Sequence, residues 1–180
     1  NGFISTNDDA IAVKLHSGVH QDMDNVVFRG NVVWTCKSAL KIGTEVSSGH
    51  KMTGIVFENN DVVHADRGIV IYCYRGSTVE GPQWIGNHFE FIGDDCRQQN
   101  IVLEIKDDMK LGLGYVNDVL IKDCTFERFS PRTSALIGGD GAHLIRGVTL
   151  ENLVIGGEKR TSLSEANIDS NRYVTEIVFK

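Results

Sequence analysis

Short segments in which apolar and polar residues alternate recur along the whole chain, and Val, Ile and Phe dominate their apolar positions. The segment "NVVFRGNVV" (25–33) resembles "GIVFENNDVV" (54–63), and further copies read "QWIGNHFEF", "DVLIKDCTF", "GVTLENLVI" and "TEIVF". A second type of strand-like segment follows the copies: "ALKIG", "GIVIY", "NIVLEI" and "SALIGG". Short alternating runs rich in β-branched residues are typical of half-buried strands. The pattern therefore predicts an all-β chain of repeated short strands.

Aligning the copies places one large apolar residue of each in a common column, with successive spacings of 29, 27, 37, 29 and 29 residues: Phe28, Phe57, Trp84, Ile121, Leu150 and Phe179. A unit of two or three short strands cannot bury its own apolar face, whereas stacked units bury it between them. We predict a single-stranded right-handed parallel β-helix of about six coils, as one domain over residues 1–180.

The main competing solenoid is the leucine-rich repeat, whose period falls in the same range. Val and Ile total 35 here against 11 Leu, and no copy shows the leucine spacing of that repeat. β-branched residues suit flat stacked strands, so the composition favours the β-helix.

A second column begins with asparagines and contains Asn31, Asn60, Asn87, Cys124 and Leu153. Stacked asparagines at coil bends can hydrogen-bond along the axis, so we predict a ladder that supports the turns. Both ends of the chain stop inside a copy, which suggests a fragment truncated at both ends. Uncapped coil ends expose strand edges, and we expect them to favour a homo-oligomer.

Composition excludes some partners. The chain carries 18 Lys and Arg against 24 Asp and Glu, without a basic run, which argues against nucleic-acid binding. No apolar stretch approaches the roughly 20 residues of a membrane span. The cysteines show no CxxC pair; buried free thiols are favoured over one or two disulfides among Cys36, Cys73, Cys96 and Cys124.

The pair Asp8 and Asp9 stands directly before the strand-like run 10–15. The repeat predicts two stacks of residues on the outer wall, Asp8–Lys37–Asp66 and Asp9–Ser38–Arg67. Coils lie about 4.8 Å apart, so Asp8 and Asp66 would be separated by roughly 9 to 10 Å. Inverting glycosidases hold their two carboxyl groups about 6.5 to 9.5 Å apart. The alternative is an acid–base ladder that only neutralises the wall.

Strand alternation makes Lys14, Lys41 and Tyr72 point outward. The small residues Ala10, Ala39 and Gly68 would point outward too and leave a shallow groove for a sugar chain. Asp94–Asp95 and Asp107–Asp108 have the hard oxygen ligands that calcium prefers, but lack the ligand spacing of a calcium loop. The six histidines are scattered, so no metal and no cofactor is predicted.

"TNDDAIAVK", "SALKIGTE" and "DRGIVIY" resemble the strands of the polygalacturonase family (glycoside hydrolase family 28, in the pectin-lyase-like superfamily). "NDDAIAVKLHSGV", "VVWTCKSALKIG" and "DVVHADRG" are also similar to coils of the dextranase and isopullulanase family (glycoside hydrolase family 49). The resemblance covers roughly residues 1–72 and implies a secreted, inverting glycosidase. By position, Asp8 and Asp9 fall on the polygalacturonase aspartate pair. The family histidine falls on Ser38, and its Arg and Lys fall on Val70 and Tyr72.

The expected function is inverting hydrolysis of a pectin-like or α-glucan polysaccharide, with Asp9 as acid, Asp8 as base and Asp66 in reserve. Five residues would bind substrate: Lys14, Lys37, Lys41, Arg67 and Tyr72. One alternative is a non-catalytic glycan-binding β-helix of the stalk or adhesin type. Another is a polysaccharide lyase or epimerase, in which a basic residue would neutralise a uronate carboxylate.

Overall fold

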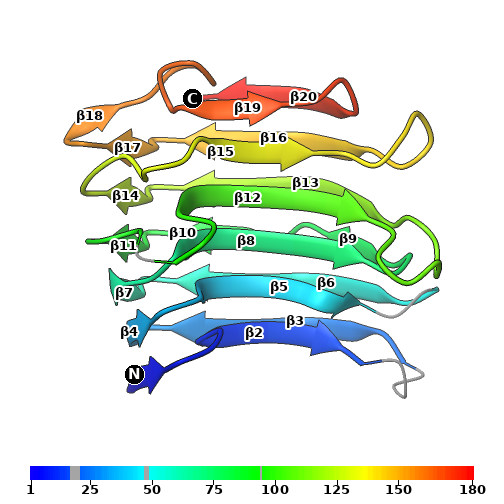
Figure 1. Ribbon diagram of the computed structural model, residues 1–180, viewed down its shortest axis with the longest axis horizontal. Helices are drawn as coiled ribbons and strands as arrows, with labels where there is room; N and C mark the ends of the chain where they lie inside the picture. The colour runs from blue at the N-terminus through cyan, green and yellow to red at the C-terminus, as the bar shows by residue number, and fades with distance from the viewer. Residues whose placement is uncertain (17–20, 47–48, 94) are drawn as a thin grey trace.

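The computed structural model describes residues 1–16, 21–46, 49–93 and 95–180. The protein is a right-handed parallel β-solenoid of about six turns, built from three sheets, and the described residues form no helix. Each turn of the chain adds one strand or more to the sheets, so the coils stack from the N-terminal blue end to the C-terminal red end (Figure 1). The predicted fold class is confirmed.

The strands divide among the sheets as follows. The first sheet contains β1 (Phe3–Thr6), β4 (Val32–Thr35), β7 (Asp61–His64), β11 (His88–Phe89), β14 (Thr125–Phe126), β17 (Val154–Ile155) and β18 (Glu158–Lys159). The second contains β3 (Met23–Arg29), β6 (Lys51–Glu58), β9 (Thr78–Glu80), β10 (Gln83–Ile85), β13 (Tyr115–Lys122), β16 (Ile145–Glu151) and β20 (Val174–Phe179). The third contains β2 (Ile11–Leu15), β5 (Ser38–Val46), β8 (Arg67–Tyr74), β12 (Gln99–Lys106), β15 (Ser134–Ile137) and β19 (Ile168–Ser170). Neighbouring strands are parallel except β17 and β18.

The predicted apolar column exists in the second sheet. Phe28, Phe57, Trp84, Ile121, Leu150 and Phe179 occupy directly paired positions in successive strands. The ring of Phe57 is stacked between those of Phe28 and Trp84, at centroid distances of 5.5 and 5.3 Å. Phe57 and Trp84 are fully buried, because stacked coils exclude water from the solenoid interior.

The one long spacing in this column, from Trp84 to Ile121, arises at two connections. Nine residues separate β11 from β12, against two between β7 and β8, and eight separate β12 from β13, against three between β8 and β9. Both insertions leave the strand register intact, and the first places additional chain beside the third sheet.

The bend after each strand of the second sheet needs a left-handed backbone. Gly30, Asn59, Gly86, Asp123 and Asn152 occupy this position in successive coils, with φ between 50° and 63°. Glycine adopts this conformation without steric cost, and Asn and Asp tolerate it better than other residues. The sequence pattern at the bends is therefore set by backbone geometry.

The asparagine ladder is confirmed beside this bend. The Asn31 side-chain amide donates to Asn60 Oδ1 at 2.9 Å, and the Asn60 amide donates to Asn87 Oδ1 at 2.9 Å. Asn60 and Asn87 also donate to the carbonyl oxygens of Phe28 and Phe57. The ladder thus satisfies polar groups inside the bend, which burial would otherwise leave unpaired.

Two expectations about burial need correction. Ala39 is fully buried in the main core, and a Cβ at Gly68 would meet the rings of Phe126 and Phe89 at 2.8 and 3.2 Å. These small residues therefore line the interior at the strand entry and do not form an outer groove. The cysteines are all free, but only Cys73 and Cys124 are buried, whereas Cys96 is exposed.

The described residues contain no helix of the length and apolarity required to cross a bilayer.

Candidate functional site

The outer wall of the third sheet brings several predicted residues together. Asp9 precedes β2, Lys41 lies on β5 and Tyr72 lies on β8, so three successive coils contribute one residue each. Lys41 Nζ is 2.5 Å from Asp9 Oδ2 and 5.3 Å from the centroid of the Tyr72 ring. The parallel register places Lys41 and Tyr72 diagonally on neighbouring strands, two residues out of alignment, because Lys41 pairs with Val70 and Gly43 pairs with Tyr72. A carboxylate, an ammonium group and an aromatic ring therefore follow one another along the wall.

Asp9 is held as a carboxylate. Burial by itself would raise the pKa of Asp9, but the hydrogen bonds from Lys41 and Ser38 and the Lys41 charge outweigh it. The pKa of Asp9 consequently lies below its usual value. The Ser38 backbone N–H donates to Asp9 Oδ1 at 3.1 Å, so both carboxylate oxygens have a partner. An ionised Asp9 suits a proton acceptor, not the proton donor expected from the sequence.

Asp8 differs from its neighbour in exposure. Its side chain faces solvent, and its Oδ1 accepts the backbone N–H of Asp9 at 2.8 Å. The backbone N–H of Asp8 donates to Thr6 Oγ1 at 3.2 Å, which closes a tight turn before β2. The turn leaves Asp8 exposed to solvent, while Asp9 points to Lys41.

Asp66 is fully buried, and its carboxylate is hydrogen-bonded to backbone N–H groups. Its carboxylate accepts N–H groups from Asp95, Arg97 and Gln98, at 3.2, 3.4 and 2.9 Å. Arg67 Nε lies 3.1 Å from Asp66 Oδ2, and its Nη1 donates to the Tyr72 hydroxyl at 3.3 Å. Asp66 therefore anchors the inserted connection between β11 and β12, and no sugar at the surface can contact its carboxylate.

The inserted connection covers part of the wall. Lys37 forms an ion pair with Asp95, and the Arg97 guanidinium lies 5.6 Å from the centroid of the Tyr72 ring. Tyr72 retains only 4% of its exposed area and belongs to a small apolar cluster outside the main core, with Val70, Tyr74 and Val102. Sequence reasoning missed Arg97 and the pairing of Asp95 with Lys37, because a non-periodic insertion has no column to align.

The remaining candidates lie further along the same face or away from it. Lys14 pairs with Glu45 at 3.0 Å and stays partly exposed. Of the acidic pairs considered for calcium, Asp94 lies outside the described residues, and Asp108 pairs with Arg75 at 3.3 Å. The wall therefore combines five predicted basic or aromatic residues, but each already has an internal partner.

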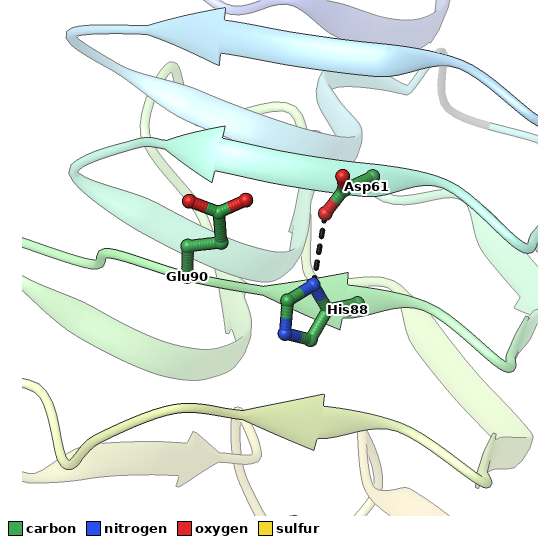
Figure 2. Close-up of side chains that lie close together, drawn as sticks. All are labelled: Asp61, His88 and Glu90. Atoms are coloured by element: carbon green, nitrogen blue, oxygen red, sulfur yellow. Dashed lines mark hydrogen bonds and ion pairs between the residues drawn. The ribbon is translucent and has the colours of Figure 1, made fainter.

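A second polar cluster lies on the outer face of the first sheet. Asp61 on β7 pairs in register with His88 on β11, and Glu90 follows β11, with all three side chains on one face (Figure 2). His88 Nδ1 lies 2.9 Å from Asp61 Oδ1, and His88 Nε2 lies 2.8 Å from Glu127 Oε1. The hydrogen bond to Glu127 raises the pKa of His88; burial opposes this and Asp61 adds to it. The cluster therefore stabilises a charged imidazole when no other cation is present.

A stacked column borders this cluster. The rings of Trp34, His64 and Phe91 follow one another at centroid distances of 5.1 Å, and the Arg128 guanidinium lies 4.7 Å from the Phe91 centroid. Rings stacked face to face expose mainly their edges, so sugar rings cannot stack on the covered faces. This column stabilises the coil stack.

Comparisons of the chain with protein-family models, with curated proteins and with solved structures found no match. The class that the fold defines is the parallel β-solenoid, and function must be argued from the sites.

Proposed function

We propose that the outer wall of the third sheet binds an extended polysaccharide and that Asp8 and Asp9 hydrolyse it with inversion. The observation that supports this proposal is the contrast between the two neighbouring acids. Asp9 is ionised and held by Lys41 and Ser38, while Asp8 faces solvent. Two carboxyl groups in different environments are the usual basis of acid and base roles in glycoside hydrolysis.

The roles are the reverse of those expected from the sequence. Asp8 takes up a proton from solvent and passes it to the glycosidic oxygen while the bond from that oxygen to the anomeric carbon breaks. Asp9 accepts a proton from a water molecule whose oxygen bonds to the same carbon from the opposite face. Lys41 keeps Asp9 ionised before the reaction, because its ammonium group stabilises the carboxylate at 2.5 Å.

Substrate contacts would come from the exposed polar groups that border this pair. Lys14 lies on β2 and the Arg97 guanidinium lies beside the Tyr72 ring, and both side chains keep solvent-accessible surface. Lys41, Arg67 and Tyr72 act beneath them as positioning residues, since they are almost completely buried. The proposal covers two activities. A polygalacturonase-like activity would act on pectic substrates, and a dextranase-like activity would act on α-glucans.

The test uses the 180-residue chain with pectic and α-glucan polysaccharides, and measures new reducing ends together with the anomeric configuration of the first product. We expect inversion, with turnover removed by Asp8→Asn and by Asp9→Asn and retained in Asp107→Asn, which alters an exposed acid elsewhere. Turnover that survives both site variants would refute the assignment.

A second candidate is a non-catalytic glycan-binding wall. The observation in its favour is that Lys37, Lys41 and Arg67 all form ion pairs with acids of the wall, as a neutralising ladder requires. Saturable binding of a polysaccharide without release of reducing ends would select this function. An unsaturated product that absorbs in the ultraviolet would instead indicate a lyase.

A further inference from the structure

The four side chains on the outer face of the first sheet form a mixed nitrogen and oxygen donor set. One candidate ligand atom each from Asp61, His88 and Glu90 lies within 4.8 Å of the other two, and Glu127 contacts the far nitrogen of His88. These residues come from three successive coils, at β7, β11 and the end of β14. We propose that Asp61, His88 and Glu90 bind a divalent transition-metal ion such as Zn²⁺, which links neighbouring coils of the solenoid.

The donor chemistry fits such an ion. Imidazole nitrogen and carboxylate oxygen are common zinc ligands, at about 2.0 to 2.2 Å, and three protein ligands leave a position for water. Asp61 Oδ1 and His88 Nδ1 are already 2.9 Å apart, close to the separation of neighbouring ligands on one ion. Rotation of the Glu90 side chain, which lies on the same face, would bring the third ligand in (Figure 2).

Glu127 gives His88 the orientation of a metal ligand. Its carboxylate receives the Nε2–H at 2.8 Å, which leaves Nδ1 directed to Asp61. Metal-bound histidines usually donate their second ring N–H to a carboxylate or carbonyl in this way. On binding, His88 loses the Nδ1 proton to solvent, and the freed lone pair bonds to the ion.

Charge favours a cation at this cluster. Three carboxylates surround one imidazole, and within the described residues no Lys or Arg forms an ion pair with Asp61, Glu90 or Glu127. Bringing these acids together without a cation costs free energy through mutual repulsion. The side chains are 40 to 55% exposed at His88, Asp61 and Glu127, so an ion can enter from solvent.

The other group of possible ligands, Asp66, Asp95 and Cys96, is a poorer site. The Asp66 carboxylate already accepts three backbone N–H groups and pairs with Arg67, and Lys37 neutralises Asp95. An ion there would have to displace these donors. Variants of the Asp61, His88 and Glu90 group therefore test the proposal, and a variant of the Asp66, Asp95 and Cys96 group provides the control.

Zn²⁺ titration by calorimetry tests the proposal on the 180-residue chain. We expect saturable binding in the unaltered protein, a loss of affinity exceeding about 10-fold in His88→Gln, and a loss of about 10-fold in Glu127→Gln, as typical for a second ligand shell. Cys96→Ser should bind as the unaltered protein does. Absence of saturable binding, unchanged affinity in His88→Gln, or a loss confined to Cys96→Ser would overturn the assignment.

A second measurement needs no variant. Addition of Mn²⁺ to isotope-labelled protein should broaden the nuclear magnetic resonance signals of Asp61, His88, Glu90 and Glu127 before those of other residues. Zn²⁺ should also raise the melting temperature, because a ligand that binds only the folded state stabilises it. Broadening centred on other residues would contradict the site even if the variants fail to fold.

Discussion

The Asp9 carboxylate at the entry of β2 and the Lys41 ammonium group on β5 form an ion pair of 2.5 Å that is largely closed to solvent. The two side chains keep 14% and 6% of their exposed area. Burying two charges away from water costs free energy unless each charge is compensated by the other. Removal of only one partner should therefore destabilise the protein more than removal of both. The same contact that stabilises the coil junction also sets the charge of the proposed base.

Removal of one partner from this pair should destabilise the fold. Lys41→Met leaves Asp9 buried without its counter-charge, and we expect a loss of about 3 kcal/mol in the free energy of unfolding. The double variant Asp9→Asn/Lys41→Met should recover part of that loss, because no uncompensated charge remains. Denaturant unfolding of both variants measures the difference; equal losses would show that the pair is not coupled.

The same pair predicts a loss of stability in acid. Since the folded-state pKa of Asp9 lies below its usual value of 3.8, its contribution is present above that value and is lost as pH falls through the folded pKa. Melting temperatures of the unaltered protein and of Asp9→Asn, measured between pH 7 and pH 2, should therefore converge in acid. A constant difference between them would contradict the assignment.

Asp66 is predicted to be a structural residue. Asp66→Ala removes the acceptor for three backbone N–H groups of the connection between β11 and β12, so that segment should become protease-sensitive. Limited proteolysis with mass spectrometry should locate cleavage within residues 90–98, while Asp107→Ala should be cut as the unaltered protein is. Loss of the whole fold in Asp66→Ala would indicate a wider role.

Phe57 should dominate the core of its coil. Truncation to Ala removes a fully buried ring from between Phe28 and Trp84 and should cost about 3 to 5 kcal/mol. The exposed Phe129 provides a control, for which the same truncation should change little, within about 1 kcal/mol. Chemical denaturation of both variants gives the comparison, and a small effect at Phe57 would contradict the packing.

The thiols should differ in reactivity. Burial raises the pKa of Cys73 and of Cys124 to about 11, so at neutral pH they are protonated and enclosed. A thiol-alkylating reagent should modify the exposed Cys96 first and reach Cys73 and Cys124 only after unfolding. Mass spectrometry of peptides resolves the order. Early modification of either buried thiol would show that the coil interior opens.

Association through open strand edges stays a prediction. Among the described residues, β3 pairs only with β6 and β20 pairs only with β16, so each has one unpaired edge. Phe28 and Phe179 are only partly buried there. Such edges favour pairing with a second chain. Light scattering should show oligomers whose share grows with concentration; a monomer at all concentrations would contradict this expectation.

The repeat itself could be predicted from residues alone, because a stacked coil imposes its period on the sequence. The column from Phe28 to Phe179 and the asparagine ladder both follow from that period, and both exist as expected. The same rule would have found the pairing of Asp61 with His88, since their 27-residue separation equals that of Phe57 and Trp84. This separation of one coil is much longer than the spacing of a few residues by which metal ligands are usually recognised in a sequence.

Other features depended on tertiary structure. The sequence could place Asp8, Asp9 and Asp66 on one side of the solenoid, but not which of them reaches solvent. That difference arises because the inserted connection after β11 folds back and donates three N–H groups to Asp66, leaving Asp8 exposed. Ala39 and Gly68 likewise face the interior although the next residues, Leu40 and Ile69, are core residues too, so simple alternation fails there. Periodicity determines which residues share a column, whereas burial and hydrogen bonding at non-periodic bends determine which of them can act.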